Sequence, residues 1–417
     1  PVFWATVGGS FLDPLLVPLM LGGLLLLLDA GRHPVVRAAL AGALFGAAAA
    51  LKYSNAIFAF AAIPLALTVP GLTGGARLRA ALAYAAGGMA ALAVLAGPWL
   101  ALMVREFGNP VFPLMNGWFR SPHAPVINLV GERFAFQGFA DAIALPFRMA
   151  LLDRSLYAEI FAPDIRFAAL LAGAIALPVL GAGRRLAGAL GGPDWRMFAF
   201  FAVASVLWAA SSSNARYGMV LLLLAGVCLA RIAERVLPAG VARVALALLL
   251  GVQVSMSVVA SPSRWFIAAP WSRHWLPYEA PERARREPAL YLTVEVLPMA
   301  AVAAFVHPAS SFVNFRGQHS LPADSPRLAA LLERHRDRVR ALGRGLALVD
   351  GVLPEDQLEA YNATLLRIGY RVDPKDCFAI PWRPQDGDPL SMAANWLAGA
   401  LPPHEPLSVA SCALRTA

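Results

Sequence analysis

AALAYAAGGMAALAVLAGPWLALM, residues 80–103, decides the fold, because this long apolar stretch contains no charged side chain. A helix needs about 20 apolar residues to cross the hydrocarbon core of a bilayer. Similar segments recur over residues 1–261, and the chain is therefore expected to be a polytopic all-α membrane bundle. We predict eight spans, near residues 14–28, 38–51, 55–69, 80–103, 167–182, 197–211, 217–230 and 244–261.

The overall composition agrees with a membrane protein. Hydrophobic residues make up 58% of the 417 residues, charged residues make up 15%, and the mean hydropathy is +0.59. Soluble domains are about half apolar and about a quarter charged, so an ordinary soluble enzyme, a disordered chain and a disulfide scaffold are excluded. The net charge of +9 would also suit a nucleic-acid-binding protein. We expect a lipid bilayer as the partner and no nucleic acid, because arginine gathers in the cytoplasmic loops of membrane proteins.

Arginine is concentrated in every second loop of the predicted bundle. Ten arginines and three acidic residues lie in four loops, at 29–37, 70–79, 183–196 and 231–243. The short opposite loops carry only Lys52 and Arg216. The positive-inside rule makes the four arginine-rich loops cytoplasmic, so the long loop 104–166 and the tail 262–417 are expected outside. A single broken helix in place of the second and third spans would remove this asymmetry.

The tail, residues 262–417, has the pattern of a small soluble α/β domain. A ninth span at 289–306 is disfavoured by Glu295 and Pro298, and we predict a helix ending near Leu297 followed by a buried strand, AAVAAF. Alternation of strands and helices favours an α/β fold. The further elements predicted in the tail are a helix at 324–342, a strand at 345–350 and a helix at 354–368.

Three features of composition bear on cellular location. The chain has only two lysines against 33 arginines, and with its abundant alanine and glycine this suggests a GC-rich bacterial genome. Cys377 and Cys412 both lie in the tail and could form a disulfide in a periplasm. The chain opens at Pro1 without methionine, in a stretch typical of the end of a loop. We therefore expect that residues precede it.

Ionisable groups at the depth of the membrane are costly, and each is a candidate site residue. Asp13 could bind a divalent cation such as Mg²⁺ or Mn²⁺, or a substrate hydroxyl; alternatively it complements the dipole of a helix N-terminus. Lys52 with Tyr53, and Arg216 with Tyr217, stand at the outer ends of spans. Their cations suit a phosphate, although a snorkelling lysine and an interfacial Arg-Tyr anchor are the alternatives.

The outer loop begins with interleaved aromatic and basic residues, in GNPVFPLMNGWFRSPH. Arg120 and His123 are basic, and Phe112, Trp118 and Phe119 are aromatic. Such a stretch could clamp an isoprenoid phosphate or stack on a sugar ring, and an interfacial aromatic belt is the alternative. The sequence lacks the P-loop, HExxH, CxxC and GxSxG motifs, so nucleotide, zinc-protease and serine-hydrolase chemistry find no support.

Four stretches together resemble the GT-C superfamily of membrane glycosyltransferases, which use polyprenyl-phosphate sugars on the outer face of the membrane. They are PVFWATVGGSFLDPLLVPL, AGALFGAAAALKYSNAIFAFAAIPL, GNPVFPLMNGWFRSP and NARYGMVLLLL. By this resemblance Asp13 would match an acid that contacts metal or acceptor, and Lys52 and Arg216 would hold the lipid phosphate. The usual catalytic base of the family lies in its first outer loop, which we expect to precede Pro1.

The resemblance implies transfer of a sugar from a polyprenyl-phosphate donor to a glycan, lipid or protein acceptor of the cell envelope. It also implies a multi-pass protein of the bacterial inner membrane with a periplasmic C-terminal domain. Two other functions stay open from the residues alone. A transporter or flippase of lipid-linked glycans could use the same basic groove, and a non-catalytic membrane scaffold would need no phosphate-sized basic site.

Overall fold

The structure is a computed structural model with two compact units, and each is described by itself. The first comprises Pro1–Trp99 and Val130–Phe266, and the second comprises Leu100–Leu129 and Ile267–Ala417. The division predicted from the sequence, 1–261 with outer loop 104–166 and 262–417, stays a prediction. The structure describes residues 2, 11–29, 31–128, 134, 138–151, 157–158, 162–177, 194–259, 279–295, 299–316, 321–343, 355–381 and 409–417.

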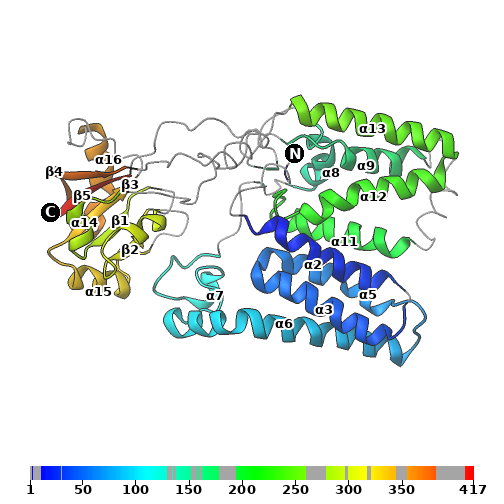
Figure 1. Ribbon diagram of the computed structural model, residues 1–417, viewed down its shortest axis with the longest axis horizontal. Helices are drawn as coiled ribbons and strands as arrows, with labels where there is room; N and C mark the ends of the chain where they lie inside the picture. Colours follow the sequence, from blue (N-terminus) through cyan, green and yellow to red (C-terminus); the bar gives the residue numbers. More distant parts are fainter. Residues whose placement is uncertain are drawn as a thin grey trace, which may run out of the picture. The chain divides into compact units, whose positions relative to one another are not determined.

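The described secondary-structure elements of the first unit are all helices, joined by loops and turns (Figure 1). Each of the eight predicted spans coincides at least in part with helix. The helices are α2 (Asp13–Leu28), α3 (Pro34–Leu51), η1 (Tyr53–Asn55), α4 (Ala56–Ala61), α5 (Ile63–Leu67), α6 (Gly75–Phe107), α8 (Phe139–Arg148), α9 (Arg166–Leu177), α11 (Trp195–Ser211), α12 (Met219–Val236) and α13 (Ala239–Val259), and α6 continues into the second unit.

Only three of these helices, α3, α6 and α13, are long and apolar enough to cross a membrane, as far as the described residues go. The prediction of eight full spans is therefore corrected. Helix α2 has 16 residues, which at 1.5 Å per residue gives about 24 Å against a hydrocarbon core of about 30 Å. The third predicted span is divided into η1, α4 and α5, and α12 carries Arg231, Glu234 and Arg235 in its last turns.

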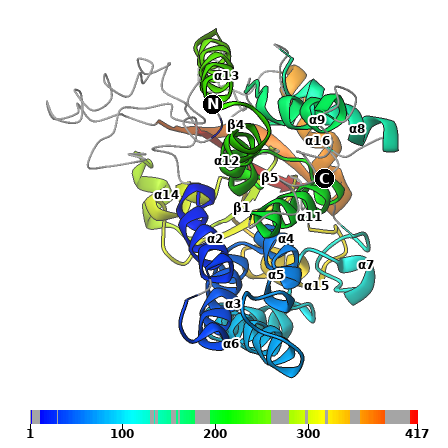
Figure 2. The same ribbon diagram turned by 90° about the vertical axis from the view of Figure 1, so that its right-hand side faces the viewer.

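Close packing of α3 on α6 depends on glycine. A Cβ added at Gly42 would lie 1.9 Å from the carbonyl oxygen of Tyr84, and one at Gly46 would lie 2.3 Å from that of Gly88. Gly87 of α6 approaches the backbone of α3 equally closely. Small residues four apart let two membrane helices bring their backbones together. Figures 1 and 2 both show α2, α3 and α6 as neighbouring helices.

Helix ends of the first unit meet at a buried arginine. Arg196, at the start of α11, is 4% exposed. Its guanidinium donates to the carbonyl oxygens of Leu27 at 2.6 Å and Leu65 at 2.5 Å. These carbonyls belong to the last turns of α2 and α5, where helix carbonyls have no partner four residues on, and that of Leu65 also accepts from the Thr68 amide at 3.2 Å. Arg196 therefore joins three helix ends, a role that its place in a predicted cytoplasmic loop did not indicate.

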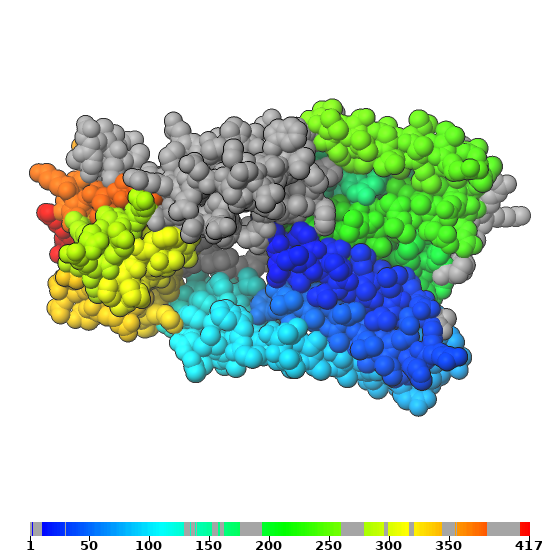
Figure 3. Space-filling view, in the orientation of Figure 1, coloured from blue at the N-terminus to red at the C-terminus, as the bar shows by residue number. Residues whose placement is uncertain are grey.

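Two of the spanning helices expose their apolar surfaces. Only 11% of the apolar window in α6 and in α13 is buried, against 39% in α3. In the space-filling view of Figure 3, α13 in green and α6 in light blue to cyan lie uncovered along two margins. Their exposed side chains, such as Leu82, Val94, Val244 and Leu248, suit a lipid environment, because lipid tails are as apolar as these side chains.

The second unit contains a mixed five-stranded sheet in the order β2-β1-β3-β5-β4. Strands β1, β2 and β3 are parallel, and β5 pairs antiparallel with both β3 and β4. The strands are β1 (Leu290–Thr293), β2 (Ser311–Asn314), β3 (Val339–Gly343), β4 (Tyr370–Ile380) and β5 (Val409–Thr416), and the helices are α14 (Glu282–Arg286), η4 (Ala300–Phe305), α15 (Pro326–Arg334), α16 (Glu355–Leu365) and η5 (Leu366–Ile368).

Both faces of this sheet are covered, because side chains alternate along a strand. Leu290 and Leu292 of β1 join a cluster with Leu328 of α15 and Leu365 of α16. Tyr291, between them, faces the opposite cluster, which includes residues of α14 and η4. The result is an α/β domain with helices on each side of the sheet, as the sequence pattern predicted.

Several elements of the tail differ from the prediction. The segment LYLT, which was predicted as helix, forms the central strand β1, and AAVAAF, which was predicted as a strand, is the 3-10 helix η4. The helix predicted over 324–342 ends at Arg334, and β3 follows it. The helix predicted at 354–368 is confirmed by α16 and η5. The strand predicted at 345–350 lies outside the described residues.

Candidate functional site

Four of the predicted site residues meet at one end of the helical unit. Asp13 begins α2, Lys52 follows α3, and Arg216 and Tyr217 precede α12. The Lys52 ammonium forms an ion pair with the Asp13 carboxylate. Lys52 Nζ also lies 4.4 Å from the centroid of the Tyr217 ring, a distance typical of a cation–π contact. Residues far apart in the sequence therefore form one cluster.

Arg216 completes this cluster from the same loop as Tyr217. Its guanidinium carbon lies 5.6 Å from the centroid of the Tyr217 ring and 4.9 Å from that of Phe11. The Tyr217 ring is thus contacted by two cations, Lys52 and Arg216. These three charged side chains comprise one carboxylate and two cations. We call Asp13, Lys52, Arg216 and Tyr217 the mouth cluster.

Local structure explains why an acid and a lysine stand at these two positions. Asp13 lies in the first turn of α2, where its negative charge complements the helix dipole, and Lys52 is the residue directly after α3, where a positive charge does the same. Asp13 is 4% exposed, and such a buried carboxylate requires a partner. The helix-dipole alternative for Asp13 therefore holds alongside its contact with Lys52.

The loop that presents Arg216 is fixed by residues that the sequence analysis did not single out. The indole nitrogen of Trp208 donates to the Asn214 carbonyl at 2.7 Å, and the Asn214 side-chain oxygen accepts from the Arg216 amide at 3.0 Å. The Ala215 amide donates to the Tyr157 carbonyl at 2.7 Å. An asparagine that bonds to a backbone amide two residues on is a common turn signal, and SSSNARYG contains it.

The residues beside Lys52 and Asp13 offer few ligands for a divalent cation. Tyr53 begins η1 and is half-buried. Within the described residues, Ser54 Oγ and Asp13 Oδ2 are buried without a hydrogen-bond partner. Mg²⁺ and Mn²⁺ prefer several oxygen ligands, and no group of three His, Cys, Asp or Glu side chains occurs within the described part of the chain. The divalent cation therefore stays a prediction from the sequence.

The outer loop after α6 belongs to the second unit, and two buried asparagines organise it. The Asn116 amide, in α7 (Asn116–Phe119), donates to the carbonyl oxygens of Ser121 and Ala124 at 2.9 and 2.8 Å. Asn109 bonds to the carbonyl of Leu114 at 2.8 Å. Both asparagines are fully buried. The two asparagines of the motif GNPVFPLMN thus hold the loop in shape. The sequence pattern had pointed to the aromatic and basic residues of this stretch instead.

His123, one of the two basic residues predicted in this loop, lines a cavity. His123 Nδ1 lies 3.0 Å from Ser325 Oγ, and its ring lines a cavity of about 210 Å³ with Phe112 and Arg327. Burial, reinforced by Arg327, holds the pKa of His123 below its usual range, so the ring is neutral at pH 7. Arg120 is exposed on the surface of the loop. Both residues lie in the unit that does not contain the mouth cluster.

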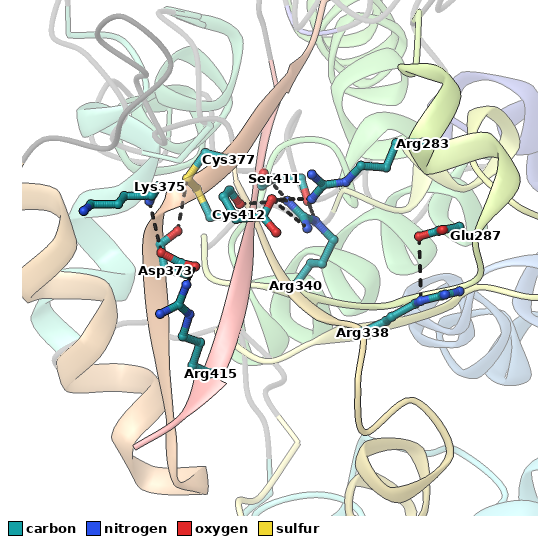
Figure 4. A network of polar contacts seen from close by, with 11 residues as sticks. Arg283, Glu287, Arg338, Arg340, Asp373, Lys375, Cys377, Ser411, Cys412 and Arg415 are labelled. Carbon is teal, nitrogen blue, oxygen red and sulfur yellow. Dashed lines mark hydrogen bonds and ion pairs between the residues drawn. A yellow bond between two sulfur atoms is a disulfide. The ribbon is translucent and has the colours of Figure 1, made fainter.

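A second polar network lies in the tail domain, around Arg340 (Figure 4). Arg340 donates to the side chain and the carbonyl of Ser411, both at 2.9 Å, and contacts Asp376, which also pairs with Arg283. Burial lowers the pKa of Arg340 to about 10. The network ties β3, β4 and β5 together, and this structural role accounts for its contacts.

The two tail cysteines are joined. Cys377 of β4 and Cys412 of β5 are partners in the antiparallel register, and a disulfide links them across a Cα–Cα distance of 4.0 Å. This pairing agrees with the expectation from the sequence. Figure 4 shows the disulfide beside Asp373 and Lys375.

The mouth cluster has the composition of a site for an anionic group. An ammonium and a guanidinium are both groups that bind phosphate oxygens, and arginine offers a planar fork of donors for them. No family model, curated protein or solved structure matches this chain. The function is therefore inferred from the chemistry of the cluster and from the membrane-spanning architecture.

Proposed function

We propose that this protein is a membrane glycosyltransferase that moves a sugar from a polyprenyl-phosphate donor to an acceptor of the cell envelope. The observation that carries the proposal is the placement of Lys52 and Arg216 against the same ring, that of Tyr217. A lipid-linked donor presents its phosphate at the membrane interface, and the mouth cluster lies at the ends of apolar helices. The resemblance of four stretches to the GT-C superfamily points to the same activity.

The two cations have a defined part in the proposed reaction. As the bond between the anomeric carbon and the phosphate oxygen breaks, negative charge grows on the lipid phosphate. Fixed positive groups stabilise such charge most effectively when they are already in place before the reaction. Tyr217 and Phe11 hold the Arg216 guanidinium, and Asp13 with Tyr217 holds the Lys52 ammonium. Asp13 is thereby a positioning residue, and no step is assigned to a divalent cation.

The proposed location is the inner membrane of a bacterium, with the mouth cluster and the tail on the periplasmic side. The arginine-rich loops support this sidedness by the positive-inside rule, provided that the shorter helices cross the membrane as well; a short helix is accommodated by local thinning of the bilayer. The Cys377–Cys412 disulfide also supports it, because disulfides persist in the periplasm and are rare in the cytosol.

Loss of either cation is expected to abolish transfer. Lys52→Ala and Arg216→Ala in the full-length protein should each lower transfer from a radiolabelled polyprenyl-phosphate sugar by about 100-fold or more, the usual effect of deleting one donor that stabilises developing charge. Retention of polyprenyl phosphate by the purified protein, measured by native mass spectrometry, should fall in parallel.

A matched control tests for unspecific effects of losing an arginine. Arg243→Ala removes an exposed arginine of α13 whose guanidinium donates to the backbone carbonyl of Ala239 at 3.2 Å. This variant should transfer and bind as the wild type does. Wild-type transfer by both Lys52→Ala and Arg216→Ala would refute the proposed role of the mouth cluster.

Cysteine alkylation tests the sidedness of the tail. In cells that are denatured and then treated with a maleimide–polyethylene glycol, Cys377 and Cys412 should stay unmodified until a reductant is added. Cys377→Ser should free Cys412 for modification and should destabilise the tail domain by about 2–4 kcal/mol, the usual contribution of a disulfide. Modification of both cysteines without reductant in freshly denatured cells would contradict the proposed periplasmic location.

A further inference from the structure

An exposed apolar surface lies on the outer loop, outside the membrane-spanning helices. It is formed by five side chains from two segments of the loop, and we call it the apolar loop face. Its members and their exposed fractions are Met115 (45%), Trp118 (72%), Phe119 (42%), Val126 (60%) and Ile127 (52%). Large apolar side chains gathered on one surface commonly mark a contact with a partner or a membrane.

The loop displays this face in a fixed shape. The Gly117 amide donates to the Ile127 carbonyl at 3.1 Å, which joins the two segments that carry the face. The buried Asn116 amide donates to three carbonyl oxygens of the loop, and its oxygen accepts from the Ser121 amide at 2.8 Å. The side-chain amide of Asn116 is thus bonded inside the loop, and the five apolar side chains are exposed.

The loop packs on the end of a candidate membrane span. Phe107, the last residue of α6, stacks on Phe112 with ring centroids 4.0 Å apart and meets the edge of His123 at 5.7 Å. The apolar stretch of α6 ends at Arg105, whose side chain is 75% exposed. The membrane surface is therefore expected near Arg105. The loop follows directly, and tryptophan is enriched at this level of a bilayer.

We propose that the apolar loop face inserts into the interfacial layer of the lipid bilayer, beside the point where α6 leaves it. Trp118 and Phe119 place their rings among the lipid headgroups, and the exposed Arg120 next to them contacts lipid phosphates. The occupant is the bilayer because the loop begins where the apolar stretch of α6 ends, at the exposed Arg105, and packs there through the stacked rings of Phe107 and Phe112.

This anchor would also orient the tail domain, because the loop is bonded to it. His123 contacts Ser325 at 3.0 Å, and Glu106 at the end of α6 pairs with Arg327 at 3.5 Å. Ser325 and Arg327 both stand at the start of α15. The inference is independent of the proposed transferase activity, because it concerns the position of the loop and requires no donor or acceptor.

Site-directed spin labelling tests the anchor in the full chain reconstituted in liposomes of phosphatidylethanolamine and phosphatidylglycerol. Nitroxides are attached at Val126→Cys and Ile127→Cys, with Trp118 left in place. Leu366→Cys is the matched control, because Leu366 is an apolar residue of the tail domain that is 44% exposed. Cys228 is buried and the other two cysteines are paired, so the natural cysteines contribute little label.

Labels at 126 and 127 should collide frequently with oxygen, which concentrates in lipid, and rarely with a water-soluble nickel chelate. The label at 366 should show the reverse. Trp118→Glu should raise the nickel accessibility at 127, because a carboxylate is disfavoured in the apolar layer. The proposal is overturned if the labels at 126 and 127 are as accessible to nickel as the label at 366, or if both are shielded from oxygen as well as nickel, as under a protein partner.

Discussion

Gly42→Ala is expected to destabilise the helical unit by about 3 kcal/mol, because the added methyl group meets backbone and not a movable side chain. The new Cβ would lie 1.9 Å from the carbonyl oxygen of Tyr84, so α3 and α6 would have to separate along their contact. Overpacked cores lose about 1–3 kcal/mol and occasionally more, and backbone contact places this variant at the upper end. Gly46→Ala should behave similarly, since its Cβ would approach Gly88. Unfolding of the purified protein in detergent, followed by tryptophan fluorescence, measures the loss.

Gly97→Ala is the control for the glycine pair. Gly97 lies in the same helix α6, and a Cβ there has no atom within 4 Å among the described residues. Alanine is favoured over glycine inside a helix by about 0.5–1 kcal/mol, so this variant should be as stable as the wild type or slightly more stable. Equal stability of Gly42→Ala and Gly97→Ala would show that α3 and α6 do not pack through their glycines.

Lys52→Met is expected to cost about 3–5 kcal/mol, the usual penalty for removing one partner of a buried ion pair. Asp13 is 3% exposed in its side chain and would be left as a buried carboxylate, whereas Lys52 is 24% exposed. Asp13→Asn should therefore cost much less, because the remaining ammonium can reach water. The double variant should be close to Asp13→Asn alone in stability. Thermal unfolding of the four proteins closes this double-mutant cycle.

Simple addition of the two single costs in the double variant would contradict a direct contact between Asp13 and Lys52. Glu234→Gln serves as a control, because it removes one partner of an exposed ion pair of α12. Exposed pairs contribute little, and this variant should unfold as the wild type does. The cycle also helps to interpret the transfer experiment. If the double variant is stable but does not transfer, the loss of transfer is not caused by unfolding.

The positions of the helices could be predicted from sequence, because apolar runs and arginine-rich loops are local features. The number of full spans could not be predicted, because the length of each helix depends on where the helix breaks. Helix α3 ends just before the polar segment Lys52-Tyr53-Ser54, and η1 begins within that segment, which also fits a tight loop. In the tail, LYLT has apolar neighbours on both sides, and only pairing with β2 and β3 decides that it is a strand.

The mouth cluster could be predicted as a set of residue types but not as contacts. Each of its charged members stands at a predicted helix end, which drew attention to Asp13, Lys52 and Arg216 one by one. Their shared contact with Tyr217 depends on how α2, α3 and α12 pack. The supporting residues Trp208 and Asn214 each bond to one backbone group; Asn214 carries a turn signal in the sequence, but nothing in the sequence indicates that Trp208 reaches its carbonyl.

The place of β5 in the sheet has a consequence for the order of events during synthesis. This strand follows β3 and β4 in the sequence but lies between them in the sheet, so it fills an interior position and not an edge. Until residues 409–416 have been synthesised, β3 has an open edge, and Cys377 lacks its partner. An uncovered strand edge invites pairing with other chains. The tail domain therefore completes its fold only after translation of β5, and a chain interrupted before Val409 would leave that edge open for aggregation or proteolysis.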